Sequence, residues 1–336
     1  MTAVPFTLGT VTSIGSLPHT DPAAAVAFVL EVCPDLPAAP TLPIHEPLEA
    51  MVAQAATGIQ GVHLAADGTL SVPDPDALDP ACAVTDPELL GSAFGTLRTF
   101  LAAVARRRAP IKLQLTGPVT LGLALIDAGV PAAVAFPVAA AAVRQRAIGM
   151  VELARRRAPN AEPVLFLDEP GLVGGLRADV PLDPDDTIDL VSSVLAAVEP
   201  MAVTGIHCCG PADWRVVLQA GPQVLSVPVG AGLTAAAGAL ATFLERGGWI
   251  AWGAVPTDRP IGEQPSRLWR HLSSQWCELV QAGCDPLLLR QQALITPVCG
   301  LALHDEVLAR HAFSLAEAVA ERLEDQVTGV RLSVGA

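Results

Sequence analysis

Short apolar segments alternate with longer segments rich in alanine and leucine along this chain of 336 residues. Eight short segments have the length and apolar character of buried strands, and they span residues 10–14, 38–42, 111–116, 164–167, 203–208, 223–227, 249–253 and 294–298. The longer segments predict helices, which include residues 21–32, 87–107, 131–157, 185–198, 231–246 and 264–282. Strands that alternate with helices form parallel βαβ units, so the pattern predicts an α/β fold.

Eight such units in a chain of this length predict a (β/α)8 TIM barrel, a fold that commonly takes about 250 residues before insertions. An open, doubly wound sheet is the alternative. No G-x-G-x-x-G motif follows the first predicted strand, which weakens the dinucleotide-binding version of that alternative. We expect a single domain over residues 1–336. Residues 67–86 are rich in proline and aspartate, so an insertion or small hairpin is expected around residues 58–86.

Composition narrows the class of protein. The chain has a net charge of −14, and its 51% hydrophobic and 16% charged residues exclude a disordered chain. Acidic residues outnumber basic residues 34 to 20, which argues against a nucleic-acid partner. The longest apolar run, residues 128–143, is interrupted and shorter than the roughly 20 residues of a spanning helix, so we expect no membrane association. With no signal-peptide pattern and an odd count of seven cysteines, we expect a cytoplasmic protein with reduced thiols.

Two predicted strand ends carry metal-binding residue types. His207 and Cys209 are two residues apart in an extended segment, so their side chains point to the same face, and Cys208 points to the other. Cys299 ends the last predicted strand, 90 residues after Cys209, and only a closed barrel would bring the two together. An imidazole and two thiolates are typical zinc ligands, and three protein ligands leave a position open. The alternative is that all three are structural residues of the core.

Six short motifs occur in order along the chain: Ile14-Gly15-Ser16-Leu17-Pro18, His45-Glu46-Pro47, Leu115-Thr116-Gly117-Pro118-Val119-Thr120, Leu167-Asp168-Glu169-Pro170, His207-Cys208-Cys209 and Pro297-Val298-Cys299-Gly300. With these motifs the chain resembles the catalytic half of cobalamin-independent methionine synthase, in the uroporphyrinogen decarboxylase and methionine synthase-like barrel superfamily. The resemblance extends from about residue 10 to about residue 325. It implies a methyltransferase that converts homocysteine to methionine.

The resemblance also implies roles for individual residues in substrate binding. Ser16 would hold the homocysteine carboxylate, and Glu46 and Asp168 would bind its ammonium group. Two carboxylates around one cation and a donor at the substrate carboxylate are charge-assisted hydrogen bonds, which are strong. Gly117 would permit close approach of the backbone to the ligand.

For the metal, the resemblance implies a Zn²⁺ ion on His207, Cys209 and Cys299 that activates the substrate thiol as a thiolate. The family has an acidic ligand after the sixth strand, where this chain has Pro228. The family also has an Asp-x-His motif after the seventh strand that is linked to proton transfer. Here only Asp258 of that motif is present, and it is the catalytic candidate.

The methyl donor is less constrained. The family tryptophan that stacks on folate is replaced by Leu121-Gly122-Leu123, and this chain is one barrel long where the long enzyme has two. A methylcorrinoid, carried by a corrinoid protein, and methyltetrahydrofolate are therefore both expected donors, with the corrinoid favoured. Three alternatives stay open: a methylcorrinoid transferase for another thiol such as coenzyme M, a non-catalytic ligand-binding barrel, and a uroporphyrinogen decarboxylase.

Overall fold

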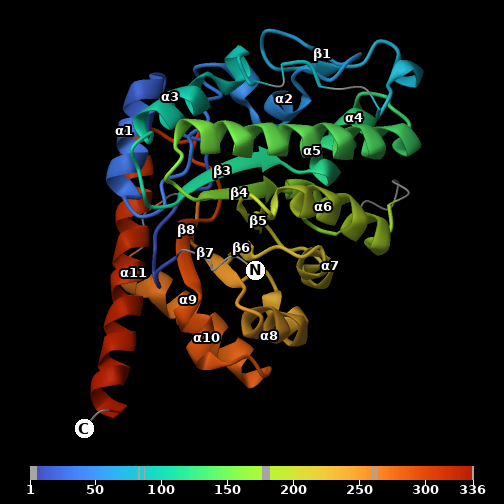
Figure 1. Cartoon of the computed structure of the whole chain (residues 1–336). Coiled ribbons are helices and arrows are strands. Elements are labelled where there is room, and N and C mark those ends of the chain that lie inside the picture. The colour runs from blue at the N-terminus through green and yellow to red at the C-terminus, as the bar shows by residue number, and fades with distance from the viewer. Residues whose placement is uncertain are drawn as a thin grey trace.

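A parallel sheet of six strands lies at the centre of the computed structural model, which describes residues 6–81, 84–86, 88–175, 182–258, 261 and 264–334, with side chains up to residue 326 (Figure 1). The strands pair in chain order: β3 (Ile111–Thr116), β4 (Pro163–Asp168), β5 (Val203–His207), β6 (Val224–Pro228), β7 (Trp249–Val255) and β8 (Ala293–Pro297). All five neighbouring pairs are parallel. The strands are buried on both faces, which explains their continuous apolar sequences.

Two amino-terminal segments complete the ring between β8 and β3. Single parallel bridges join them to the sheet and to each other: Val11 with Ile295 of β8, Ser16 with Thr41, and Ala38 with Lys112 of β3. Backbone hydrogen bonds support each junction, for example Thr12 N–H to the Ile295 carbonyl at 3.1 Å and Leu17 N–H to the Thr41 carbonyl at 3.0 Å. The eight parallel segments therefore form a closed (β/α)8-type barrel, as predicted.

The predicted regular strands at residues 10–14 and 38–42 are nevertheless wrong in detail, because each makes only isolated bridges. Proline explains the second segment, since Pro37, Pro40 and Pro43 have no N–H to donate to a continuous ladder. Directly after the first segment, Gly15 has a φ of +153°, which departs from regular strand geometry. The ring is closed by irregular backbone at this point.

Helices cover the outside of the barrel (Figure 1). They are α1 (Pro22–Val32), α2 (Met51–Ala56), α3 (Gly95–Ala103), α4 (Pro118–Asp127), α5 (Ala132–Arg157), α6 (Pro184–Val198), α7 (Trp214–Gln219), α8 (Ala237–Glu245), α9 (Pro265–Gln281), α10 (Pro286–Gln291) and α11 (Glu306–Val334). A small antiparallel hairpin, β1 (His63–Leu64) with β2 (Leu70–Ser71), lies within residues 58–86, where an insertion is predicted. It packs beside the barrel, on the side of α2.

Two predicted helices begin later than expected. The helix predicted over residues 87–107 begins at Gly95, because the carboxylate of Asp86 accepts from the N–H groups of Leu90 and Gly91 and holds that segment as a loop. The helix predicted over residues 231–246 begins at Ala237, after Gly232 with a left-handed φ of +76° and a 3-10 turn, Leu233–Ala236. Both differences come from local polar or backbone geometry at the helix start.

Among the described residues, α5 is the one helix whose length and composition would allow it to cross a membrane. In this fold it packs against α4, α6, β3 and β4, and 56% of its most apolar window is buried inside the protein. Arg146 lies within it, buried, and its guanidinium donates to the backbone carbonyls of Thr57 and Asp86. Packing in the outer layer of the barrel accounts for the apolar character of α5.

The inside of the barrel is filled by an apolar cluster made of Leu36, Val164, Phe166, Val203, Val224, Ala251 and Leu294. Lys112, the only lysine in the sequence, lies against this cluster and is 1% exposed. Its Nζ donates to the Ile14 carbonyl at 2.8 Å and lies 4.7 Å from the centre of the Phe166 ring. The carboxyl ends of the strands are left for polar side chains, as in other barrels of this kind.

Candidate functional site

Four polar residues lie in one register at the carboxyl ends of neighbouring strands. Thr116 of β3 pairs with Asp168 of β4, Asp168 with His207 of β5, and His207 with Ser226 of β6. Adjacent residues in register on a sheet have side chains on the same face. The strand register therefore gathers a carboxylate, an imidazole and two hydroxyls at one level of the barrel mouth.

A cavity of about 300 Å³ lies directly above this level. Its lining residues come from both closing segments, from α2 and from the carboxyl ends of β3, β4, β5 and β8: Ile14, Ser16, Thr41, Pro43, Glu49, Ala50, Met51, Gln54, Gln114, Leu115, Thr116, Asp168, Pro170, His207, Cys209, Cys299 and Gly300. The cavity combines apolar walls with a few polar groups, as small-molecule sites commonly do.

His207, Cys209 and Cys299 come together on one side of the cavity. One ligand atom from each residue lies within 4.8 Å of the others, although Cys299 is distant in sequence. A tetrahedral ion with these ligands separates the donor atoms by about 3.5–3.8 Å. The cluster is compact enough to hold one metal ion, and a buried nitrogen with two sulfurs is a donor set that suits zinc.

His207 is oriented as a metal ligand would be. Its Nδ1 lies 2.9 Å from Oγ of Ser226, while its Nε2 is buried and makes no hydrogen bond within the described structure. Burial lowers the pKa of His207, so the imidazole is neutral at pH 7 and offers a lone pair. An unpartnered, buried lone pair that faces two sulfurs fits a metal site better than a structural histidine.

The three cysteines of this region differ in their electrostatics. A hydrogen bond from the Cys299 thiol lowers the pKa of Cys209, and the same contact raises the pKa of Cys299 to about 12. Cys208 points away into the core, where it is 0% exposed and burial raises its pKa to about 11. Cys209 therefore carries the more readily ionised thiol, and Cys208 takes no part in the cluster.

Asp168 lines the same cavity as His207, on the neighbouring strand. Its Oδ1 is buried and has no hydrogen-bond partner in the described part of the chain. Burial raises the pKa of Asp168, and the positive charge of Lys112 opposes that shift. A buried carboxylate oxygen without a donor is ready to accept from a ligand.

The other predicted site residues occupy different positions. Ser16 lines the cavity next to Gly300. Glu46 precedes a 3-10 turn, Pro47–Glu49, and accepts from the Leu48 N–H at 3.1 Å, outside the set of residues that line the cavity. Asp258 is exposed in the loop after β7 and is also outside that set. The proposed contacts of Glu46 and Asp258 with a ligand stay predictions.

Gly117 is required by packing. It precedes α4, and a Cβ atom at this position would collide with Oε1 of Glu169. Glu169 is 0% exposed and accepts from the N–H groups of Val119 and Thr120 at the start of α4. The adjacent carboxylates therefore divide their roles, because Asp168 faces the cavity and Glu169 holds a helix.

Glu49 and Gln114 are two of the lining residues that were not identified from the sequence. Glu49 is 2% exposed, and its carboxylate accepts from the N–H groups of Leu42 and Thr96, both at 2.8 Å. Gln114 lies two residues before Thr116 on β3, so the alternation of the strand puts both side chains on the cavity face. That alternation is the sequence signal that could have identified Gln114.

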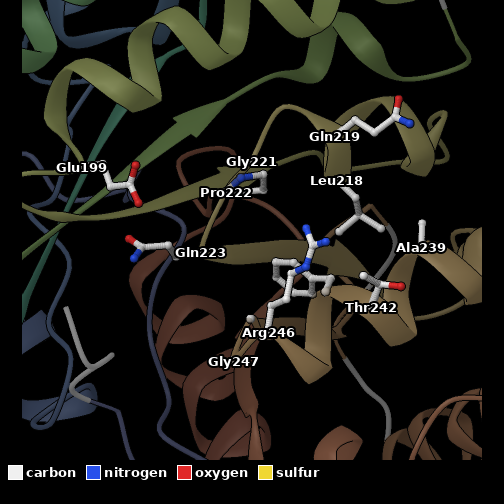
Figure 2. Close-up of a pocket in the computed structure, with 12 residues that line it drawn as sticks. Glu199, Leu218, Gln219, Gly221, Pro222, Gln223, Ala239, Thr242, Arg246 and Gly247 are labelled. Atoms are coloured by element: carbon white, nitrogen blue, oxygen red, sulfur yellow. The ribbon is translucent and has the colours of Figure 1, made fainter. Parts of the chain in front are cut away.

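A larger hollow of about 510 Å³ lies at the other end of the barrel, next to the amino ends of β6 and β7. Figure 2 shows it between α7 and α8, with Glu199, Gln223 and Arg246 among its lining side chains. Neither histidine nor cysteine lines this hollow. It lies away from the carboxyl ends of the strands, where barrel enzymes have their active sites.

Several solved structures share the fold of this chain. A B12-independent methionine synthase from Shewanella sp. W3-18-1, in complex with selenomethionine, is 15% identical with a TM-score of 0.63, covering 96% of this chain and 99% of that one. A methyltransferase from Methanosarcina mazei is 18% identical with a TM-score of 0.59, and covers 94% of both chains. This chain shares their fold. A putative vitamin-B12 independent methionine synthase from Listeria monocytogenes is similar at 13% identity and a TM-score of 0.57, covering 91% of this chain and 86% of that one.

No family model and no curated protein sequence matches this chain. The fold neighbours are methionine synthases and a methyltransferase, and the resemblance predicted from the motifs agrees with them. At these identities the agreement concerns the fold. The activity of this chain has to be argued from its own cavity.

Proposed function

We propose that this protein is a zinc-dependent methyltransferase that moves a methyl group to the thiol of an amino acid, with homocysteine as acceptor and methionine as product. The observation that carries the proposal is the cluster of His207, Cys209 and Cys299 within 4.8 Å at the wall of a cavity that also holds Ser16 and Asp168. Two chemical arguments support the proposal. A metal ion on the cluster would bind the thiol of the acceptor, and Ser16 and Asp168 would bind the carboxylate and the ammonium group of an amino acid.

The protein side chains would position the acceptor. Oδ1 of Asp168 would accept from the ammonium group, and Ser16 would donate to the carboxylate. Ser226 would hold the imidazole of His207 with Nε2 toward the cavity. A bound zinc ion would supply a Lewis acid that favours the thiolate form of the acceptor. The new S–C bond forms as the bond from the methyl group to its donor breaks, and the thiol proton leaves to solvent.

The surroundings of the cavity mouth bear on the donor. Several large apolar side chains are exposed in the segments that follow the strand ends: Ile44 (57%), Met51 (40%), Val173 (40%) and Leu303 (99%). Exposed large apolar side chains near a site can mark a surface for a large apolar group or a partner. We infer that the donor is bulky, and a methylcorrinoid on a carrier protein is favoured over methyltetrahydrofolate.

The decisive assay is formation of methionine from homocysteine by the zinc-loaded protein, with methylcobalamin and methyltetrahydrofolate compared as donors. We expect product with methylcobalamin and a lower rate with the folate. A second arm replaces homocysteine by coenzyme M, because a transferase for another thiol would prefer it. Product from neither donor with either thiol, together with a protein that does not retain zinc, would favour a non-catalytic barrel.

A further inference from the structure

The side-chain amide of Gln114 has a fixed orientation beside the cavity. One end of the amide contacts the backbone carbonyl of Ala39, which can only accept, so the atom at that end is the donor Nε2. The amide lies against Gly15, where a Cβ atom would collide with it. Gln114 is therefore held on two sides, and the other end of the amide is the acceptor Oε1.

Oε1 of Gln114 is buried, and no donor reaches it from any described residue. The side chain is 6% exposed and belongs to the cavity lining. A buried acceptor without a partner is costly, and native structures satisfy nearly all such groups by protein, water or ligand. Because Gln114 lines the cavity, a ligand bound there could supply the missing donor.

A second buried oxygen in the same cavity lacks a partner, namely Oδ1 of Asp168. Asp168 is in register with Thr116, one inward-facing position from Gln114 on the adjacent strand, within reach of long side chains. Glu49 also lines the cavity, but both of its oxygens accept from backbone N–H groups. Two unpartnered acceptors that line one cavity from adjacent strands suit a ligand group with several N–H donors, and a primary ammonium provides three.

We propose that Gln114 is a specificity-determining residue, whose Oε1 accepts a hydrogen bond from the ammonium group of the amino-acid ligand beside Asp168. This inference rests on the proposed function, because that function supplies an amino acid. Gln114 adds an acceptor that carries no charge. It therefore selects for N–H groups, where Asp168 selects for positive charge as well.

The test is calorimetric binding of methionine and of its desamino analogue, 4-(methylthio)butanoate, to the zinc-loaded protein. We expect Gln114→Met to weaken methionine binding about tenfold, the effect of losing one hydrogen bond to a charged group, and to leave the analogue within about twofold.

Gln292→Met is the matched control. Gln292 is also buried, with its Nε2 donating to the carbonyls of Leu244 and Gly248 and its Oε1 unpartnered, but it lies at the amino end of β8. It is expected to leave both affinities unchanged. Equal weakening of both ligands by Gln114→Met would show a merely structural role and overturn the inference. Wild-type protein that binds neither methionine nor homocysteine would overturn the proposed function, and this inference with it.

Discussion

Nδ1 of His207 lies 2.9 Å from Oγ of Ser226 on the neighbouring strand, so the imidazole presents Nε2 to the sulfurs of Cys209 and Cys299. Hydrogen bonds to the second nitrogen of a metal-binding histidine fix its tautomer and its orientation. Here Ser226 of β6 supplies that contact. The family that this chain resembles has an acidic ligand two residues later, at the position of Pro228. In this chain β6 therefore contributes to the site through the hydroxyl of Ser226.

We expect Ser226→Ala to weaken zinc binding by about 10–100-fold, because the imidazole loses its orienting partner. A competition titration against a chromophoric chelator measures the affinity. Ser193→Ala is a suitable control, since its hydroxyl bonds only the Leu190 carbonyl within α6. Unchanged zinc affinity in Ser226→Ala would contradict the assigned orientation.

Cys208 and Cys209 provide a matched pair for the metal site. We expect Cys209→Ser to purify with less than half of the wild-type zinc, because a hydroxyl replaces a thiolate ligand. Cys208→Ser removes an adjacent sulfur that is buried in the core and points away from the cavity, so it is expected to keep its zinc. Metal content by mass spectrometry measures both. Full zinc in Cys209→Ser would exclude it as a ligand.

Gly117→Ala is expected to destabilise the protein by about 1–3 kcal/mol, because the new Cβ would displace Glu169 from the start of α4. Gly238→Ala is the control, since Gly238 lies within α8 and has no atom within 4 Å of an added Cβ. That change should be neutral or stabilising by up to about 1 kcal/mol. Urea unfolding distinguishes the two, and equal midpoints would be the contrary result.

The contribution of Glu169 to the stability of the barrel should fall between about pH 4.5 and pH 7. Burial raises the pKa of Glu169 to about 7 from an ordinary value of 4.5. The folded state therefore binds this proton more tightly than the unfolded state. Its contribution is complete below about pH 4.5 and is lost as the pH rises through 7, to an extent of about 3 kcal/mol.

Urea unfolding at several pH values measures that slope, and Glu169→Gln is expected to flatten it. Asp168, whose pKa burial also raises, would keep part of the slope. Glu169→Gln should also lower the stability at every pH, because an amide cannot accept all three donors that the carboxylate accepts from Val119 and Thr120. A slope identical to that of the wild type would contradict the raised pKa.

Much of the fold follows from sequence because the strands are buried on both faces. Residues 111–116 match β3 without error, and residues 223–227 differ from β6 by one position. The two closing segments could not be predicted as they are. Their pairing depends on prolines and on backbone hydrogen bonds to strands that are distant in sequence. Local patterns contain no information on such contacts.

The candidate site could likewise be predicted from the sequence only in part. Strand alternation predicts that His207 and Cys209 share a face, and the barrel brings Cys299 to them. Which glutamate faces the cavity depends on the 3-10 turn Pro47–Glu49 and on the backbone of Leu42 and Thr96, and the sequence does not encode that directly. No motif marks Gln114, and only its alternation with Thr116 along β3 indicates that it faces the cavity.

Lys112 gives the protein an unusual chemical property. It is the only lysine, and its ammonium is enclosed between the Ile14 carbonyl and the Phe166 ring inside the barrel. Reagents that acylate amines will therefore find no lysine on the folded surface, and they can modify this residue only when the barrel opens. The extent of acylation at this single position, read by mass spectrometry, becomes a direct measure of how often the barrel opens.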